Sequence, residues 1–111
     1  MTRKKATPEQ QALEAGRGCG MTPFTFHTDP GHGWLEVPAA DVRALGVKVS
    51  RYSYRSRDGR TVYLEEDCDA PAFVEVWTAK HGQRPEYREQ DHANSAPCRA
   101  LPHVSAWDFP G

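Results

Sequence analysis

From Phe24 to Val37 the chain is Phe-Thr-Phe-His-Thr-Asp-Pro-Gly-His-Gly-Trp-Leu-Glu-Val, and this segment sets the start of the predicted sheet. Its two ends are apolar and strand-like, and the Asp29-Pro30-Gly31 turn between them predicts a β-hairpin. Two imidazoles, a carboxylate and an indole lie in or beside this turn, at His27, Asp29, His32 and Trp34. A turn needs only its Pro and Gly for its backbone angles. We therefore predict that the loop is part of a working surface.

The whole chain has the size and composition of one small domain. It has 111 residues, of which 38% are hydrophobic and 26% charged, so we expect one lean core. A formal net charge of -1 argues against a protein that binds nucleic acid over its whole surface. No stretch has the ~18 apolar residues of a membrane span, and no apolar secretory segment follows the basic start. The odd number of scattered cysteines favours a reducing compartment, and we predict a cytoplasmic protein without a membrane partner.

Helix and strand patterns alternate after the first hairpin. A short helix is predicted over Ala39–Leu45, because Pro38 precedes it and Gly46 can end it. A second hairpin pairs residues 47–57 with residues 60–66, and Asp58-Gly59 between them fits a type I′ turn.

A second helix is expected from Asp69, as its N-cap, to about Lys80, followed by an edge strand over residues 85–88. This order predicts an α+β fold, with a small antiparallel sheet and two short helices on one face. We divide the chain into a flexible or helical N-terminal arm over 1–21, a single α+β domain over 22–90 and an irregular C-terminal tail over 91–111.

The register of the second hairpin follows if Asp58-Gly59 is the whole loop. Tyr54 then lies opposite Tyr63, and Val62 and Leu64 point to the face beneath the helices. The tyrosine face could be open or covered by a terminal segment. We predict that the core is one cluster, made of Trp34, Leu35, Val37, Val42, Leu45, Val62, Leu64, Phe73, Val76 and Trp77.

The His27, Asp29 and His32 set has three interpretations. Imidazole and carboxylate are good zinc or iron ligands, and they also serve in acid/base catalysis. A metal site needs three or four ligands, so the remainder would come from Glu36, His81, His92 or the acidic run described next. The simpler interpretation, which we prefer, is a turn capped by Asp29 whose histidines shield the strand ends or form a binding surface.

The acidic run is Glu65-Glu66-Asp67-Cys68-Asp69. It could bind a divalent cation or dock an arginine-rich partner, although acids also favour a helix N-terminus by their interaction with its dipole. It lacks the alternating ligands and the sixth-position glycine of an EF-hand. We prefer the helix-start interpretation, with docking as the second.

Arginines and tyrosines alternate along the second hairpin, at Arg51, Tyr52, Tyr54, Arg55, Arg57 and Arg60. Such a pattern can hold a single nucleic-acid strand by phosphate contact and stacking, yet tyrosine is also simply a good strand residue. Cys68 is a weak candidate nucleophile, since a helix N-terminus can stabilise a thiolate. No P-loop, dinucleotide fingerprint, nucleophile elbow or paired zinc-cysteine motif is present.

Two blocks of the sequence resemble a family of small uncharacterised proteins carried by bacteriophages and other mobile elements. They are His27-x-Asp29-Pro30-Gly31-His32-Gly33-Trp34-Leu35-x-Val37-Pro38 and, after Ser53-Tyr54, Tyr63-Leu64-Glu65-Glu66-Asp67-Cys68-Asp69. The resemblance spans roughly residues 24 to 80. It implies no activity and no catalytic residues. It implies a context in which small proteins bind and block host machinery, including CRISPR effectors and restriction enzymes.

We therefore predict a small non-catalytic phage or mobile-element protein that binds and inhibits a host protein or ribonucleoprotein complex, such as an anti-CRISPR or another anti-defence inhibitor. Its location would be the cytoplasm of the bacterial host. We expect no cofactor and assign no metal ligand. The alternatives are a metal-dependent enzyme or ligand-binding module built on the first turn, and a single-stranded nucleic-acid binder. The predicted partner-binding residues are His27, Asp29, His32, Trp34, Glu65, Glu66 and Asp67.

Overall fold

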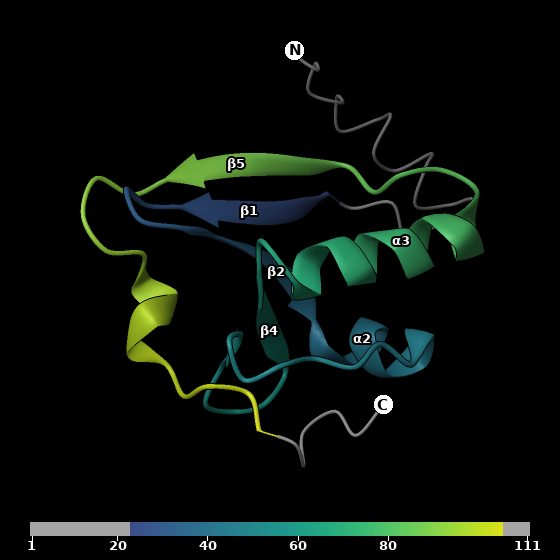
Figure 1. Cartoon of the computed structure of the whole chain (residues 1–111), viewed down its shortest axis with the longest axis horizontal. Coiled ribbons are helices and arrows are strands. Elements are labelled where there is room, and N and C mark those ends of the chain that lie inside the picture. The colour runs from purple at the N-terminus through teal and green to yellow at the C-terminus, as the bar shows by residue number, and fades with distance from the viewer. Residues whose placement is uncertain (1–22, 106–111) are drawn as a thin grey trace.

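The computed structural model describes residues 23–105, which form a five-stranded sheet with two helices on one face (Figure 1). The predicted α+β class is confirmed. The strands lie in the order β3-β4-β2-β1-β5. The elements are β1 (Phe24–Thr28), β2 (Gly33–Pro38), α2 (Ala39–Leu45), β3 (Tyr54–Arg55), β4 (Thr61–Glu65), α3 (Asp69–His81), β5 (Tyr87–Asp91) and the 3-10 helix η1 (Pro97–Ala100). The predicted N-terminal arm lies outside the described residues.

The first hairpin and α2 form where the sequence predicts them. His27 pairs with Trp34 across β1 and β2, and the loop closes between the backbone N–H of Asp29 and the carbonyl of His32 at 2.9 Å. Helix α2 has the predicted bounds and ends at Gly46, whose φ of 69° lies in the left-handed region that favours glycine. Local pattern and turn chemistry are therefore sufficient for this part of the chain.

The second hairpin has the predicted register but a different turn. Tyr54 lies opposite Tyr63, as expected. The N–H of Ser56 donates to the carbonyl of Thr61 at 2.9 Å, which encloses residues 57–60 as the loop. A type I′ turn needs positive φ at both central residues, but only Gly59, at 75°, has one. The type I′ prediction is therefore wrong, and so is the long strand over 47–57, of which only Tyr54–Arg55 pairs as β3.

Helix α3 begins at Asp69 itself, so the prediction of Asp69 as the N-cap is wrong. Its buried carboxylate instead accepts hydrogen bonds from the hydroxyls of Ser50 at 2.7 Å and Ser53 at 2.5 Å. These bonds tie the irregular segment before β3 to the helix. The buried face of α3 is also shifted from the prediction, since Val76 is 38% exposed while the neighbouring Val74 packs against the core.

Strand β5 makes the sheet mixed. It pairs with β1 in parallel, so the prediction of a wholly antiparallel sheet is wrong at this edge, although an edge strand is present here. The reason is the path of α3, which carries the chain back along the sheet after β4, so that β5 starts from the same end as β4. No helix of the described chain is long and apolar enough to cross a membrane.

The sheet buries side chains on both faces, so the prediction of a single core cluster is wrong. Beneath the helices lie Leu35, Val37, Val62, Leu64 and Phe73 among others, and this part of the prediction is confirmed. Leu45 is only partly buried. Trp34 points the other way because successive strand residues alternate between faces. There it packs with Ala96 and Cys98 from the segment after β5.

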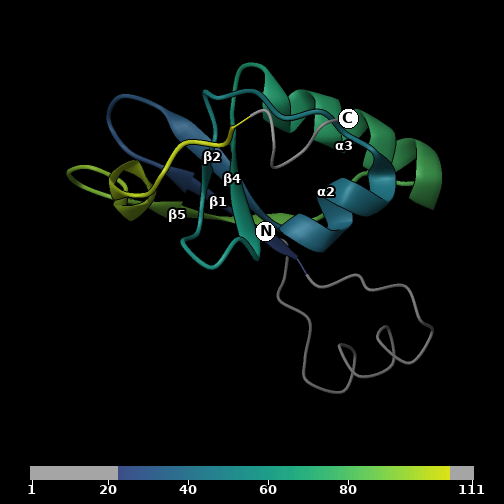
Figure 2. The same cartoon turned by 90° about the horizontal axis from the view of Figure 1, so that it is seen from below.

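That segment covers the second face of the sheet. Figure 2 shows the chain after β5, with η1, on the opposite side of the sheet from α2 and α3. Tyr54, Tyr63 and Leu101 pack around its buried residues. The tyrosine face is therefore covered by part of the C-terminal segment, which is one of the two outcomes that the sequence left open.

Candidate functional site

The structure brings the first turn and the acidic run together at one corner of the sheet. His32 Nε2 contacts Glu65 Oε2 directly and lies 4.0 Å from Asp67 Oδ2, while His32 Nδ1 lies 3.9 Å from Glu66 Oε1. The backbone N–H of Glu66 also donates to the carbonyl of Gly33 at 3.1 Å, which extends the pairing of β2 with β4. One imidazole thus faces three carboxylates, and we call His32, Glu65, Glu66 and Asp67 the acidic corner.

Gly33 allows this close approach. A Cβ at this position would lie 2.8 Å from the ring of Phe26 and 3.0 Å from Glu66 Oε1. Both distances are too short for an ordinary side-chain contact, so only glycine fits without displacement. The glycine after His32 therefore has a packing role rather than a conformational one, since its φ is not positive.

Asp29 holds the turn and the segment after β5 in place. One carboxylate oxygen accepts the N–H groups of Gly31 at 2.9 Å and His32 at 3.0 Å, and the other accepts the N–H of Ala96 at 2.8 Å and Arg99 Nε at 2.6 Å. The Arg99 guanidinium and these backbone N–H groups hold the pKa of Asp29 well below its ordinary value. Asp29 is therefore an ionised anchor that fixes the backbone of His32.

Glu65 is the buried member of the acidic corner. Burial raises its pKa, but the backbone N–H of Asp67, the hydrogen bond to His32 and the N–H of Cys68 together lower the pKa below its ordinary value. Cys68 N donates to Glu65 Oε1 at 2.8 Å, which leaves Oε2 directed at His32. The carboxylate is thus ionised and fixed in orientation.

His27 belongs to a separate group on the second face of the sheet. Its Nε2 lies 2.6 Å from Glu36 Oε1, and its Nδ1 lies 3.0 Å from Nε2 of His92, whose ring stacks on it with centroids 5.2 Å apart. The His27 side chain is 13% exposed. This hydrogen-bonded chain joins β1 and β2 to the first residue after β5.

The predicted grouping of His27, Asp29 and His32 is therefore corrected. The three side chains have separate partner sets, because His27 lies within β1 and points to the second face, whereas the turn directs Asp29 toward Arg99 and His32 toward Glu65. Asp29 and Trp34 have buried side chains, so their roles are supporting ones. Among the predicted partner-binding residues, His32, Glu66 and Asp67 remain accessible.

Two further predictions for this region are not supported by the geometry. Burial and the charge of Glu65 raise the pKa of Cys68, so its thiol lacks the stabilised thiolate that a nucleophile requires. On the second hairpin, Tyr54 and Tyr63 lie beneath the segment after β5 and do not present open rings for stacking bases. Tyr52 is exposed, but a single ring is not a stacking platform.

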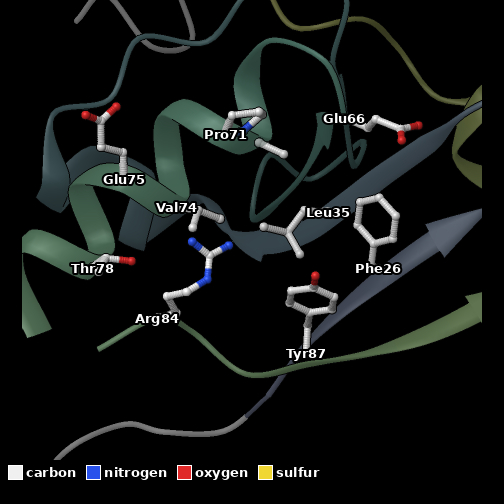
Figure 3. Close-up of a pocket in the computed structure, with 10 residues that line it drawn as sticks. Phe26, Leu35, Glu66, Pro71, Val74, Glu75, Thr78, Arg84 and Tyr87 are labelled. Atoms are coloured by element: carbon white, nitrogen blue, oxygen red, sulfur yellow. The ribbon is translucent and has the colours of Figure 1, made fainter. Parts of the chain in front are cut away.

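A pocket of about 440 Å³ lies beside the acidic corner, between α3 and the edge formed by β1 and β5 (Figure 3). Phe26, Leu35 and Val74 supply its apolar lining, and the half-exposed Tyr87 forms a wall. This volume is within the range of ligand pockets.

The charged lining of the pocket comes from both sides. Figure 3 shows the Arg84 guanidinium extending toward α3, with Glu66 and Glu75 at the rim. Glu66 belongs both to this rim and to the acidic corner. No local pattern in the sequence indicates the pocket, because its residues come from elements far apart in the chain.

No family model matches this chain, and no curated protein or solved structure matches it either.

Proposed function

We propose that the chain is a small non-catalytic binding protein of phage or mobile-element origin that docks on a host protein complex and blocks it. The observation that carries the proposal is the position of Glu66, which joins the acidic corner to the apolar pocket. An apolar cavity with Glu66 and Glu75 at one rim and Arg84 opposite suits a partner segment in which a large apolar side chain is flanked, on the side of the carboxylates, by Lys or Arg.

The chemistry of the accessible groups favours binding over catalysis. The two histidines lie in separate groups, and each is engaged by a carboxylate of this chain. The thiol of Cys98 is buried, and burial raises its pKa to about 12. The imidazoles of His27 and His32 and the thiol of Cys98 are thus each engaged or buried, whereas an apolar pocket with a charged rim suits docking of a partner side chain.

The pocket half of the proposal is tested by a matched pair of substitutions on α3. Val74→Arg would place a charged side chain in the pocket, whereas Val76→Arg would place the same side chain on the exposed side of the helix. With each variant as bait in a bacterial lysate, we expect Val74→Arg to lose the captured complex and Val76→Arg to retain it. Equal capture by both variants would remove the pocket from the proposal.

The acidic half is tested by charge reversal. Glu66→Lys should weaken capture of the partner, and the weakening should be largest at low salt because exposed charges are screened as ionic strength rises. Glu89→Lys, on the exposed strand β5, is the control for a general change of charge. Phage plating on hosts that carry a CRISPR effector or a restriction enzyme, with and without the chain expressed, tests the inhibitory role. Unchanged plating on every such host would contradict it.

A further inference from the structure

We propose that His32, Glu65 and Asp67 bind a divalent transition-metal cation, with Zn²⁺ as the best fit. His32 Nε2, one oxygen of Glu65 and one oxygen of Asp67 all lie within 4.8 Å of one another. This inference does not rest on the proposed function, since it concerns an ion rather than a partner protein. It also replaces the ligand set considered from the sequence, because His27 and Asp29 are engaged elsewhere.

The three side chains come from two segments of the chain, the first turn and the end of β4 with the residues after it, and their ligand atoms gather within 4.8 Å of one another. His32 is placed by the β1–β2 turn, Glu65 ends β4, and Asp67 lies in the turn before α3. The Asp29 hydrogen bond fixes the backbone of His32, and the Cys68 N–H occupies the far oxygen of Glu65. Preorganised ligands of this kind lower the ordering cost of binding an ion.

Burial and charge both favour a cation here. The Glu65 side chain is only 10% exposed, and the oxygen that the Cys68 N–H leaves free faces the imidazole of His32. Within the part of the chain that the structure describes, the carboxylates of Glu65, Glu66 and Asp67 all lie within 4.0 Å of a His32 ring nitrogen. A ligating imidazole is neutral, so an ion here would face three carboxylates, and a divalent cation would offset two of their three charges.

The donor set selects the metal. One imidazole nitrogen and two carboxylate oxygens suit zinc, whose ligands lie at ~2.0–2.2 Å, so neighbouring donors of a tetrahedral site are about 3.4 Å apart. His32 Nε2 and Glu65 Oε2, which contact each other directly, would separate to admit the ion, and Asp67 Oδ2, 4.0 Å from Nε2, would approach by rotation of its exposed side chain. Magnesium and calcium prefer all-oxygen sites. Three protein ligands leave a fourth zinc position for water or for a donor from a partner.

Titration calorimetry of the untagged full chain with ZnCl₂, after removal of bound metal with a chelator, tests the proposal. We expect one zinc per chain and a rise in Tm on zinc addition. H32Q and D67N should each weaken zinc binding by at least about tenfold. D67N is the cleaner variant, since the Asp67 side chain is 72% exposed and its replacement should leave the fold intact. MgCl₂ should bind at least about tenfold more weakly than ZnCl₂.

Two histidine variants serve as controls. H81Q removes an exposed histidine at the end of α3, and H92Q removes the histidine that stacks on His27. Both should bind zinc as the wild type does. Absence of stoichiometric zinc, unchanged binding by both H32Q and D67N, or a loss in H92Q alone would overturn the assignment. The Val74→Arg variant should keep zinc binding even where it loses the partner, so failure of this proposal is distinguishable from failure of the proposed function.

Discussion

The two faces of the sheet are buried in different ways. Beneath the helices the contacts are between aliphatic and aromatic side chains such as Leu64 and Phe73. On the other face Trp34 and the tyrosines pack beside hydrogen-bonded ionisable groups, and Arg99 lies 4.8 Å above the Trp34 ring. Burial of apolar area is non-directional and tolerant, whereas hydrogen bonds and ion pairs require particular partners. The helix face therefore supplies most of the stability, and the second face fixes the positions of the charged groups.

Leu64→Ala should have the largest effect and would test the role assigned to the helix face. Leu64 is fully buried at the centre of that face, so the substitution should lower the free energy of unfolding by about 2–5 kcal/mol. Urea unfolding measures the change. Tyr63→Ala, the corresponding truncation one residue away on the second face, is the comparison and should have a smaller effect, because Tyr63 is only partly buried. Similar losses for the two variants would mean that the faces contribute equally.

Gly33→Ala should have the next largest effect, because a Cβ at Gly33 would come too close to both Phe26 and Glu66 of the acidic corner. The added methyl group would contact the Phe26 ring and should lower the free energy of unfolding by about 1–3 kcal/mol. Gly31→Ala is the control, since its Cβ would meet the far end of the flexible Arg99 side chain. Thermal unfolding of both variants gives the comparison, and an unchanged Tm for Gly33→Ala would contradict this packing.

The pH dependence of the stability of Asp29→Asn would test the role of the charged groups on the second face. The folded-state pKa of Asp29 lies below its ordinary value of 3.8, chiefly because of Arg99 and the Ala96 N–H. Its contribution to stability is therefore complete above about pH 4 and is lost as the pH falls through the folded-state pKa. The difference in free energy of unfolding between wild type and Asp29→Asn should be constant from pH 7 to pH 5 and should narrow below pH 4. If the difference in free energy of unfolding widened below pH 4, the folded-state pKa of Asp29 would lie above its ordinary value, which would contradict this prediction.

Val76→Lys should have the smallest effect, although the spacing of apolar residues in the sequence predicted that Val76 lies in the core. Because Val76 is 38% exposed, the substitution should change the free energy of unfolding by no more than about 0.5 kcal/mol. Urea unfolding measures this too. A loss comparable with that of Leu64→Ala would mean that the helix buries the predicted face after all.

The sequence predicted the candidate site only in part. It identified the first turn and the acidic run, and it named Glu36, His81 and His92 as further candidate ligands of a metal there. Glu36 and His92 instead contact His27. It grouped His27, Asp29 and His32 wrongly, because their partners lie far along the chain. His32 meets Glu65 across 33 positions, and Asp29 meets Arg99 across 70. No local period carries such pairings.

The sequence by itself determined the elements that depend on neighbours in the chain. Turn residues, helix ends and the alternation of side chains gave the first hairpin, α2 and the register of Tyr54 with Tyr63. Only the tertiary structure decided the parallel pairing of β5 and the cover over the second face of the sheet. It also decided which carboxylate meets which histidine. These features depend on the path of α3 across the sheet and on contacts that form only after the chain has returned, so no local pattern encodes them.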